Sequence, residues 1–190
     1  MTNDKIHKIF EKTGGVLKGH FKLTSGRHAD TYMQCAKLFT DATCSEELCK
    51  ALAAKLKDYK ADCVISPAVG GILMGYELSS QLKLPNLFAE RENGKFVLRR
   101  GFELKNGSKV IVCEDVVTTG GSVKEVIDLL NELKAEVIAV ASIVDRSNGK
   151  VDFGVPFVPL MQVDIESYEP SECPICKEGK IPLYKPGSRA

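Results

Sequence analysis

Two adjacent acidic residues, followed by a run of small and hydroxyl residues, are the most informative motif of the sequence. Glu114 and Asp115 directly follow the apolar run 110–113, and Thr-Thr-Gly-Gly-Ser occupies positions 118–122, ahead of a helical pattern. A helix N-terminus presents unpaired N–H groups, glycines let the backbone approach an anion, and hydroxyls donate further hydrogen bonds. These residues predict a site for one phosphate group. Carboxylates would repel that phosphate, so the acidic pair indicates another task, namely binding ribose hydroxyls and helping to hold a magnesium ion.

A phosphate site beside an acidic pair is the chemistry that a ribose 5-phosphate requires. No lysine precedes Ser122 in the Gly-x4-Gly-Lys-Ser pattern of a nucleoside triphosphate loop, and no Gly-x-Gly-x-x-Gly follows a predicted strand. The structural alternative is a strand that runs into a helix capped by Thr or Ser, with the acids solvated at the strand end. The placement of the motif between a strand and a helix favours the binding site.

Hydrophobic spacing predicts the elements that position this motif. Apolar residues recur at helical intervals in three segments, 48–59, 72–82 and 123–133. Apolar runs without alternation, typical of strands buried on both faces of a parallel sheet, occupy residues 63–65, 110–113 and 137–144. The alternation of helices and strands predicts a single α/β domain with a parallel sheet. Ligands of such sheets bind beyond the carboxyl ends of the strands, and four such junctions follow Ser66, Glu90, Asp115 and Val144.

The segment 114–122, Glu-Asp-Val-Val-Thr-Thr-Gly-Gly-Ser, resembles the signature of the type I phosphoribosyltransferases, which use phosphoribosyl diphosphate (PRPP). The resemblance implies their fold, a central parallel sheet flanked by helices with a small N-terminal hood. The segments 1–40 and 165–190 are the candidates for the hood and an appendage, and residues 169–190 are expected to be an ordered coil. The resemblance also implies which residues here contact PRPP: Glu114, Asp115, Val116, Val117, Thr118, Thr119, Gly120, Gly121 and Ser122.

Other segments, along nearly the whole chain, resemble the orotate phosphoribosyltransferases of that family. Residues 19–28 with Tyr32 are similar to the hairpin that contacts the base, and an arginine at the place of Arg146 contacts the base in the family. The planar fork of arginine suits a carboxylate, which distinguishes orotate from uracil. The residues expected at the base are Ser25, Arg27, Tyr32, Thr118 and Arg146. The alternatives are an ordinary Ser-Gly hairpin and a surface arginine paired with Asp145 or with the helix beneath it.

Two further segments are candidates for binding the diphosphate. Residues 66–71 resemble the family's pyrophosphate loop, so the backbone of Ala68, Val69 and Gly70 is expected to contact PRPP, although the glycines also suit close packing of helix on strand. The basic segment 90–101 is expected to be a mobile lid that excludes water, and its alternative is a solvated hairpin. Arg91 and Lys95 of this lid are predicted to bind PRPP and to act in catalysis with the acidic pair.

The sequence departs from better-known orotate enzymes at cationic positions. Thr24-Ser25-Gly26 stands where many have Lys-Ser-Gly, Val69 or Gly70 where a lysine binds pyrophosphate, and a histidine often found in the lid is missing. We therefore expect the positive charge to be carried by four lid residues, Arg91, Lys95, Arg99 and Arg100.

Composition excludes several other classes of protein. The net charge of +1 gives no support to sequence-independent binding of nucleic acid or of a membrane surface. The N-terminus lacks a signal-peptide core, and no apolar run approaches the roughly 18 residues of a membrane span. A cytoplasmic location is therefore expected.

The 7 cysteines lack the spacing of a disulfide framework, so most are expected to be reduced thiols in the core. Cys173 and Cys176 have the spacing of half a zinc site or of a redox pair. Because no second Cys/His pair follows them, and His7, His20 and His28 show no ligand spacing, we expect two thiols in a turn.

The function expected is transfer of a phosphoribosyl group from PRPP to orotate, with Mg²⁺ held mainly through PRPP. Family members are commonly homodimers, and a homodimer is expected here. One alternative is a purine phosphoribosyltransferase, which shares the PRPP site and differs in the base pocket. Arg146 and the N-terminal hairpin argue against this alternative. The other is a regulator that keeps the fold and binds nucleic acid, which the near-neutral charge opposes.

Overall fold

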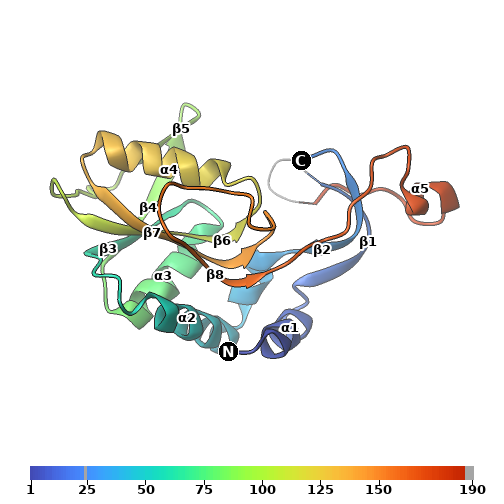
Figure 1. Ribbon diagram of the computed structural model, residues 1–190, viewed down its shortest axis with the longest axis horizontal. Coiled ribbons are helices and arrows are strands. Elements are labelled where there is room, and N and C mark those ends of the chain that lie inside the picture. The colour runs from blue at the N-terminus through green and yellow to red at the C-terminus, as the bar shows by residue number, and fades with distance from the viewer. Residues whose placement is uncertain (24, 187–190) are drawn as a thin grey trace.

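A six-stranded sheet forms the centre of the protein, and helices cover both of its faces (Figure 1). The computed structural model describes residues 1–23 and 25–186, so Thr24 of the expected hairpin motif and residues 187–190 lie outside the described residues. In spatial order the strands are β5 (Lys95–Leu98), β4 (Asn86–Glu92), β3 (Cys63–Pro67), β6 (Lys109–Val117), β7 (Glu136–Asp145) and β8 (Phe157–Gln162). Neighbouring strands are parallel except β4 and β5. The predicted parallel α/β architecture is therefore confirmed.

The helices are α1 (Asn3–Lys12), the 3-10 helix η1 (Cys35–Thr40), α2 (Ala42–Leu56), α3 (Gly71–Leu82), α4 (Gly121–Glu132) and the short α5 (Pro174–Glu178). The longest of them lie on the two faces of this sheet. Figure 1 shows α2 and α3 on one face and α4 on the other. In β6, Ile111 and Cys113 join the core under α2 and α3, whereas Val110 and Val112 join the core under α4. Burial on both faces explains why the strand has no polar alternation.

Several elements lie where the hydrophobic pattern did not predict them. Strand β6 includes the acidic pair, as the junction expected after Asp115 implies, and continues two residues further, to Val117. Strand β8 contains Pro159, and it forms an edge of the sheet, where a missing N–H donor is tolerated. Among the described residues, no helix has both the length and the hydrophobicity that crossing a membrane requires.

A second, two-stranded sheet lies beside the main one. It pairs β1 (Val16–Lys22) with β2 (His28–Met33) in antiparallel register, as the hairpin motif predicts. The C-terminal segment runs along this hairpin: Lys22 N donates to Tyr184 O and His28 N donates to Tyr168 O, both at 2.8 Å. Figure 1 shows the hairpin and α5 extending away from the six-stranded sheet. The described part of the segment expected to be a coil, residues 169–186, is mostly coil and contains α5, and single bridges join Tyr168 and Tyr184 to the hairpin.

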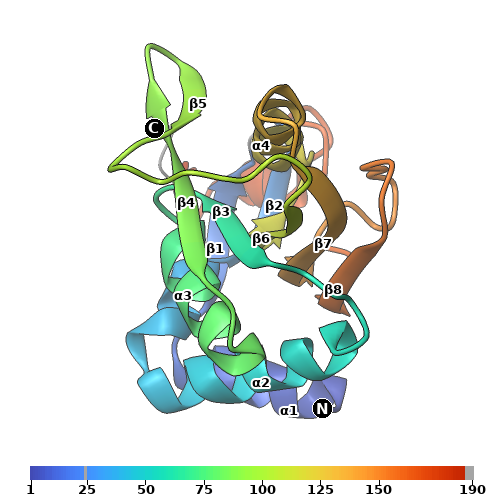
Figure 2. The ribbon, with the colours of Figure 1, turned by 90° about the vertical axis from the view of Figure 1, so that its left-hand side faces the viewer.

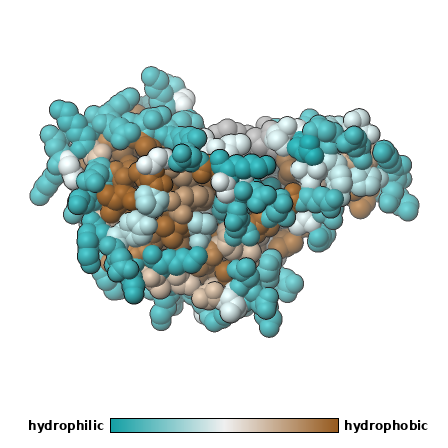
Figure 3. All heavy atoms as spheres, in the orientation of Figure 1, coloured by the Kyte–Doolittle hydropathy of each residue, from teal (hydrophilic) through white to brown (hydrophobic). Residues whose placement is uncertain are grey.

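The two parts of the molecule differ in the surface they present. In the view of Figure 3, hydrophobic atoms come to the surface mainly over the half that contains the six-stranded sheet, whereas hydrophilic atoms cover most of the extended half.

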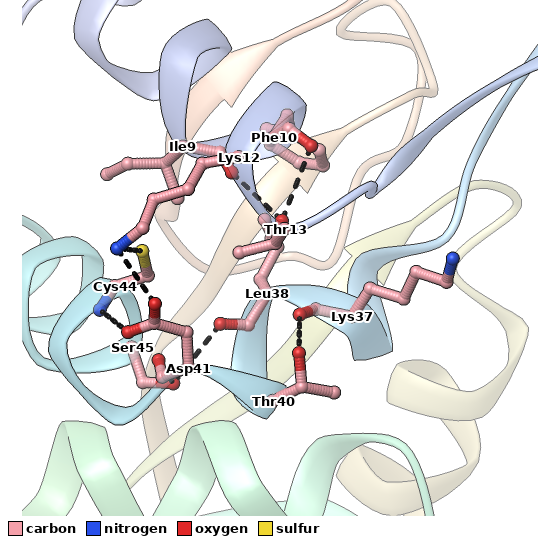
Figure 4. Close-up of polar contacts among 10 residues, drawn as sticks. All are labelled: Ile9, Phe10, Lys12, Thr13, Lys37, Leu38, Thr40, Asp41, Cys44 and Ser45. Atoms are coloured by element: carbon pink, nitrogen blue, oxygen red, sulfur yellow. Dashed lines mark hydrogen bonds and ion pairs between the residues drawn. The ribbon is translucent and has the colours of Figure 1, made fainter.

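Polar contacts fix α1 and α2 to each other (Figure 4). Asp41 precedes α2 and caps it: Oδ1 accepts a hydrogen bond from Cys44 N at 3.0 Å, and Oδ2 lies 2.8 Å from Lys12 Nζ of α1. The hydrogen bond from Lys12, followed by that from the Cys44 backbone, lowers the pKa of Asp41 to about 2. A single carboxylate therefore stabilises the start of α2 and links it to α1.

Candidate functional site

The carboxyl ends of three neighbouring parallel strands meet at one edge of the sheet. Val117 at the end of β6 is paired in register with Asp145 at the end of β7, and Arg146 N donates to Val117 O at 2.8 Å. Strand β3, which ends at Pro67, lies on the other side of β6. The loops after the three strands, all of which were predicted to bind substrate, therefore begin side by side.

The acidic pair lies at this edge, where Asp115 is buried and Glu114 is half-buried. Asp115 is only 8% exposed, and its Oδ1 accepts a hydrogen bond from Val116 N at 2.8 Å. Burial, and then the charge of Asp115, raises the pKa of Glu114 well above its usual range, and burial also raises the pKa of Asp115. Among the described residues, no lysine or arginine forms an ion pair with either carboxylate. The two carboxyl groups are desolvated, hydrogen-bond to each other and have no cationic partner among the described residues, so hydroxyl donors or a cation would stabilise their charged forms.

The predicted pyrophosphate loop lies against this pair. A Cβ added at Gly70 would lie 3.7 Å from Asp115 Oδ1, and one added at Gly71 would lie 3.2 Å from Glu114 Oε1 and 3.0 Å from the Ser66 Cβ. Ala68 N donates to Ala89 O of the next strand at 2.8 Å, and Val69 is 82% exposed. The glycines thus allow the first turn of α3 to approach the two carboxylates closely. This geometry suits both explanations of the glycines, a loop that binds pyrophosphate and close packing of the helix on the strand.

The predicted phosphate loop leads into an open helix N-terminus. Gly120 is the N-cap of α4 with φ of 74°, no side chain caps the helix, and its first turn contains no acidic residue. A Cβ at Gly120 would lie 2.8 Å from Val151 Cγ1, so this position has no room for a side chain. Thr118 and Thr119 are exposed. The free N–H groups and the positive end of the helix dipole are available to an anion.

Arg146 faces the hairpin. Its guanidinium carbon lies 5.6 Å from the centre of the Tyr32 ring. Burial lowers the pKa of Arg146 and raises that of Tyr32, and the Arg146 charge opposes the latter shift. The structure therefore brings together these two residues, predicted at the base from segments far apart in sequence.

Asp145 holds the loop that carries Arg146. It is 2% exposed, and its two carboxylate oxygens accept hydrogen bonds from Ser147 N at 2.7 Å and Gly149 N at 3.2 Å. The alternative in which Asp145 pairs with the Arg146 side chain is therefore wrong. Sequence reasoning missed the role of Asp145, although an aspartate at the end of a strand is a common signal for such a turn.

The other two hairpin residues lie differently. Ser25 Oγ accepts a long hydrogen bond of 3.4 Å from Arg27 N at the bend. The Arg27 guanidinium donates to Ser167 Oγ at 2.9 Å and forms an ion pair with Glu169. In this conformation Arg27 binds the C-terminal segment, so its predicted contact with the base stays a prediction.

The predicted lid is the hairpin formed by β4 and β5, which rises beyond the rest of the sheet in Figure 2. The side chain of Arg91 forms an ion pair of 2.7 Å with Glu125 of α4, and its guanidinium carbon lies 4.2 Å from the centre of the Phe96 ring. Arg91 lies close to the bend of the hairpin, so this pairing fixes the bend end of the hairpin to α4.

Two other cations of the segment are also paired with acids within it. Arg100 Nε lies 2.7 Å from Glu90 Oε2, and Arg99 lies 3.6 Å from Glu92. Lys95, next to the bend, is exposed. The positive charge of the lid is largely neutralised in this conformation. For the lid to bind PRPP, as predicted, its arginines must leave these acids and contact the substrate.

Sequence reasoning also missed a cluster outside this edge. One ligand atom from each of four side chains, those of His20, His28, Cys173 and Cys176, lies within 4.8 Å of the others. The sequence shows no second Cys/His pair after the two cysteines, but the structure brings His20 and His28, from near the N-terminus, beside them. That the two thiols lie in a turn without a metal stays a prediction. The available signal was that His20 and His28 lie on opposite strands of the predicted hairpin.

Comparisons with known proteins agree with the geometry. Residues 39–153 match the family model of the phosphoribosyl transferase domain. An orotate phosphoribosyltransferase of Thermoanaerobacter sp. (strain X514) is 58% identical over 189 residues, 100% of this chain and 99% of that protein. One of Caldanaerobacter subterraneus subsp. tengcongensis is 56% identical over the same shares. The crystal structure of orotate phosphoribosyltransferase from Aeropyrum pernix matches with a TM-score of 0.72 and 25% identity, over 83% of this chain and 93% of that one.

Proposed function

This chain belongs to the orotate phosphoribosyltransferase family, and from that premise we propose that it transfers the 5-phosphoribosyl group of PRPP to orotate. The products are orotidine 5′-monophosphate and pyrophosphate, in the synthesis of UMP. The observation that carries the assignment is the meeting of three features at one sheet edge: the open N-terminus of α4, the buried acidic pair, and Arg146 beside Tyr32.

The proposed mechanism is a displacement at the anomeric carbon. The N1 atom of orotate forms the new bond as the bond to pyrophosphate breaks, and the proton of N1 passes to the departing pyrophosphate or to water. Positive charge develops on the ribose ring during the displacement. No covalent intermediate with the protein is needed. The protein therefore acts by holding the two substrates in line, stabilising charge and excluding water.

Each predicted segment has a task in this scheme. The residues 118–122 and the first turn of α4 hold the 5-phosphate, while Glu114 and Asp115 accept hydrogen bonds from the ribose hydroxyls. Backbone groups of residues 68–70 bind the departing pyrophosphate. Arg146 binds the orotate carboxylate, and Tyr32 orients Arg146. The proposal is supported by the absence of an ion-pair partner for Arg146 among the described residues, since a partly buried guanidinium favours an anion.

The lid acts on the leaving group. When its ion pairs open, Arg91 and Lys95 are free to stabilise the charge of pyrophosphate. The bend between β4 and β5 has two residues with positive φ, Asn93 at 51° and Gly94 at 84°, and lies in an exposed hairpin. The bend can move over a substrate in the manner of a lid, while Phe96 of β5 stays in the core under α4.

Magnesium is part of the proposal. The buried carboxylates of Glu114 and Asp115 have no cationic partner in the described part of the chain, and carboxylate oxygens are the ligands that Mg²⁺ prefers. The residues present therefore fit the ion. Mg²⁺ would be held mainly by PRPP and would neutralise charge on the diphosphate. The two acids would help to hold the ion by binding the ribose hydroxyls.

We also propose a cytoplasmic homodimer. On α3 and the loop before it, Val69, Leu73 and Tyr76 are 82%, 57% and 66% exposed. Their spacing of four and three residues places Leu73 and Tyr76 on one helical face with Val69 at its start. A second copy of the chain is the proposed occupant, because this face adjoins the pyrophosphate loop, where a neighbour's lid would reach the site.

The test is orotate-dependent consumption of PRPP, followed by the loss of orotate absorbance with magnesium present or withheld. Purines and uracil serve as competing acceptors. We expect turnover with orotate alone and only with magnesium, and Asp115→Asn should lose most of it while remaining folded. Turnover with a purine at the same rate, or an unchanged rate in Asp115→Asn, would overturn the proposal.

A further inference from the structure

The cluster of His20, His28, Cys173 and Cys176 has the geometry of a metal site. His20 Nε2 lies 3.2 Å from His28 Nδ1, 3.5 Å from Cys173 Sγ and 3.4 Å from Cys176 Sγ, and His28 Nδ1 lies 3.2 Å from Cys176 Sγ. Tetrahedral zinc with Zn–N of about 2.05 Å and Zn–S of about 2.3 Å implies edges of about 3.3 Å between nitrogens and about 3.6 Å between nitrogen and sulfur. The observed separations lie within a few tenths of an ångström of these values.

Hydrogen bonding alone does not explain the convergence on His20. Its Nδ1 lies 3.1 Å from Ile181 O, and a carbonyl oxygen can only accept, so Nδ1 carries the ring proton of a neutral His20. Nε2 then has a single lone pair, yet three potential ligand atoms surround it. A cation shared by all four groups satisfies them together. The contact with Ile181 is also the outer-shell hydrogen bond that metal-bound histidines usually make.

Backbone contacts bring the four ligands together from two distant parts of the chain. His20 and His28 lie on the paired strands β1 and β2, and both are 4% exposed. The backbone of His28 exchanges two hydrogen bonds with Tyr168, and Tyr184 N donates to His20 O. The C-terminal segment is therefore held on both sides of α5.

The cysteines come from the start of that helix. Cys173 is its N-cap and Cys176 is three residues further on, a spacing that places both sulfurs on one face. Cys173 is fully buried, whereas Cys176 is exposed, which leaves an entry path for an ion.

We propose that these four residues bind one structural Zn²⁺, which fastens the C-terminal segment to the β1–β2 hairpin. Two nitrogen and two sulfur ligands in a tetrahedral arrangement select zinc among the common ions. Two thiolates balance the charge of the ion, so the largely buried site is neutral. All four coordination positions are protein ligands, which is typical of a structural site and not of a catalytic one.

The site also bears on the base pocket that the proposed function requires. His28 and Tyr32 lie on the same strand, four residues apart, and Tyr32 contacts Arg146. Fixing the first residue of β2 restrains the strand that carries Tyr32. Loss of zinc should therefore raise the KM for orotate more than the KM for PRPP. This consequence rests on the proposed function, whereas the metal measurement below does not.

The decisive experiment is metal analysis of the full chain purified without a polyhistidine tag and dialysed. We expect about one zinc per chain. Cys176→Ser should weaken zinc binding by at least about 10- to 100-fold, the loss that even an outer-shell substitution causes. His7→Ala, which removes an exposed histidine outside the cluster, should keep the wild-type content. Absence of zinc from the wild type, or equal zinc in Cys176→Ser, would overturn the proposal.

Two measurements guard against a folding artefact. Because Cys176 is exposed, its serine variant should keep the wild-type circular dichroism spectrum. In the wild type, a strong chelator should lower Tm and added Zn²⁺ should restore it, since an ion that binds the folded state stabilises it. Cobalt in place of zinc should give the intense visible bands of a tetrahedral thiolate complex. A metal-free protein whose Cys173 and Cys176 form a disulfide would identify a redox pair and exclude the zinc site.

Discussion

The guanidinium of Arg146 and the ring of Tyr32 face each other, with 5.6 Å between the guanidinium carbon and the ring centre. The contact joins the end of β7 to the second strand of the hairpin. Among the described residues, no carboxylate forms an ion pair with Arg146, and the Tyr32 ring presents an aromatic face to its charge. In the proposed function, this pair binds a planar anion, the carboxylated base.

Substitution of Arg146 should selectively damage use of the acceptor. Removing one partner of a buried charge pair costs about 2–5 kcal/mol, so Arg146→Ala should lower kcat/KM for orotate by roughly 30-fold to several thousand-fold. The KM for PRPP should change little. Lys150→Ala, an exposed cation on the same loop, is the control. Equal losses for both substrates would show that Arg146 acts on the fold of the loop instead.

The two glycines at the start of α4 should respond differently to alanine. Gly120 has φ of 74° and its Cβ would lie 2.8 Å from Val151 and 2.9 Å from Phe153, so Gly120→Ala should destabilise the fold as well as abolish activity. The backbone strain alone is about 1–2 kcal/mol. At Gly121 the nearest atom is Thr119 Oγ1 at 3.8 Å, so Gly121→Ala should fold normally.

Gly121→Ala therefore isolates the approach of the phosphate to the backbone. We expect its thermal unfolding to match that of the wild type while the KM for PRPP rises. Wild-type kinetics for this variant would mean that the 5-phosphate does not approach that amide.

Asp41 has two separable roles at the start of α2. Asp41→Ala removes both the cap on Cys44 N and the ion pair with Lys12, whereas Asp41→Asn keeps a capping oxygen. Exposed ion pairs contribute little to stability, so the Tm of Asp41→Asn at pH 7 should be close to that of the wild type. The Tm of Asp41→Ala should be lower, because this variant also loses the cap. Similar Tm losses in the two variants would assign the stabilisation to Lys12.

The parts of this structure that were predictable from sequence are those with local causes. Ile111 and Cys113 face one core and Val110 and Val112 the other, which is the burial that an apolar run without alternation predicts for a strand. The loop after this strand was predicted because glycine and hydroxyl residues at the start of a helix can bind an anion. Membership of the family then confirmed the function inferred from that loop.

The features that were not predictable depend on contacts between distant segments. Cys173 and Cys176 gave half of a tetrahedral site, but nothing local indicates that His20 and His28 lie beside them. Likewise, the composition of the lid predicts its positive charge but not the pairing of Arg91 with Glu125. Such pairings follow from the path of the chain, which periodicity does not specify.

The exposed apolar face of α3 should control association. Leu73 is 57% exposed, and replacing it with glutamate would place a charge in the proposed interface between two copies. Leu73→Glu should shift the protein from dimer to monomer in light scattering coupled to size exclusion. Leu133→Glu, at an exposed leucine after α4, should leave the mass unchanged. A wild-type monomer, or a dimeric Leu73→Glu, would contradict the proposed interface.

The charge of Glu114, which the proposed reaction uses, should lower the free energy of unfolding of the protein without substrate. Burial and the neighbouring Asp115 raise its pKa in the folded state, so over the pH range above its ordinary value the folded protein binds more protons than the unfolded chain. The free energy of unfolding then falls as pH rises. Glu114→Gln removes this charge and keeps an oxygen that can accept the hydrogen bond from Asp115 N.

Without PRPP and magnesium, Glu114→Gln should therefore melt at a higher temperature than the wild type at pH 8, and the difference should shrink as pH is lowered and the wild-type carboxyl takes up its proton. Turnover should fall in the same variant, because an amide is a weaker acceptor for the ribose hydroxyls. Melting curves between pH 5 and pH 8, with the exposed Glu132→Gln as control, measure the effect. Parallel curves for Glu114→Gln and the wild type would mean that the acidic pair is not destabilising, and that its burial is compensated within the free protein.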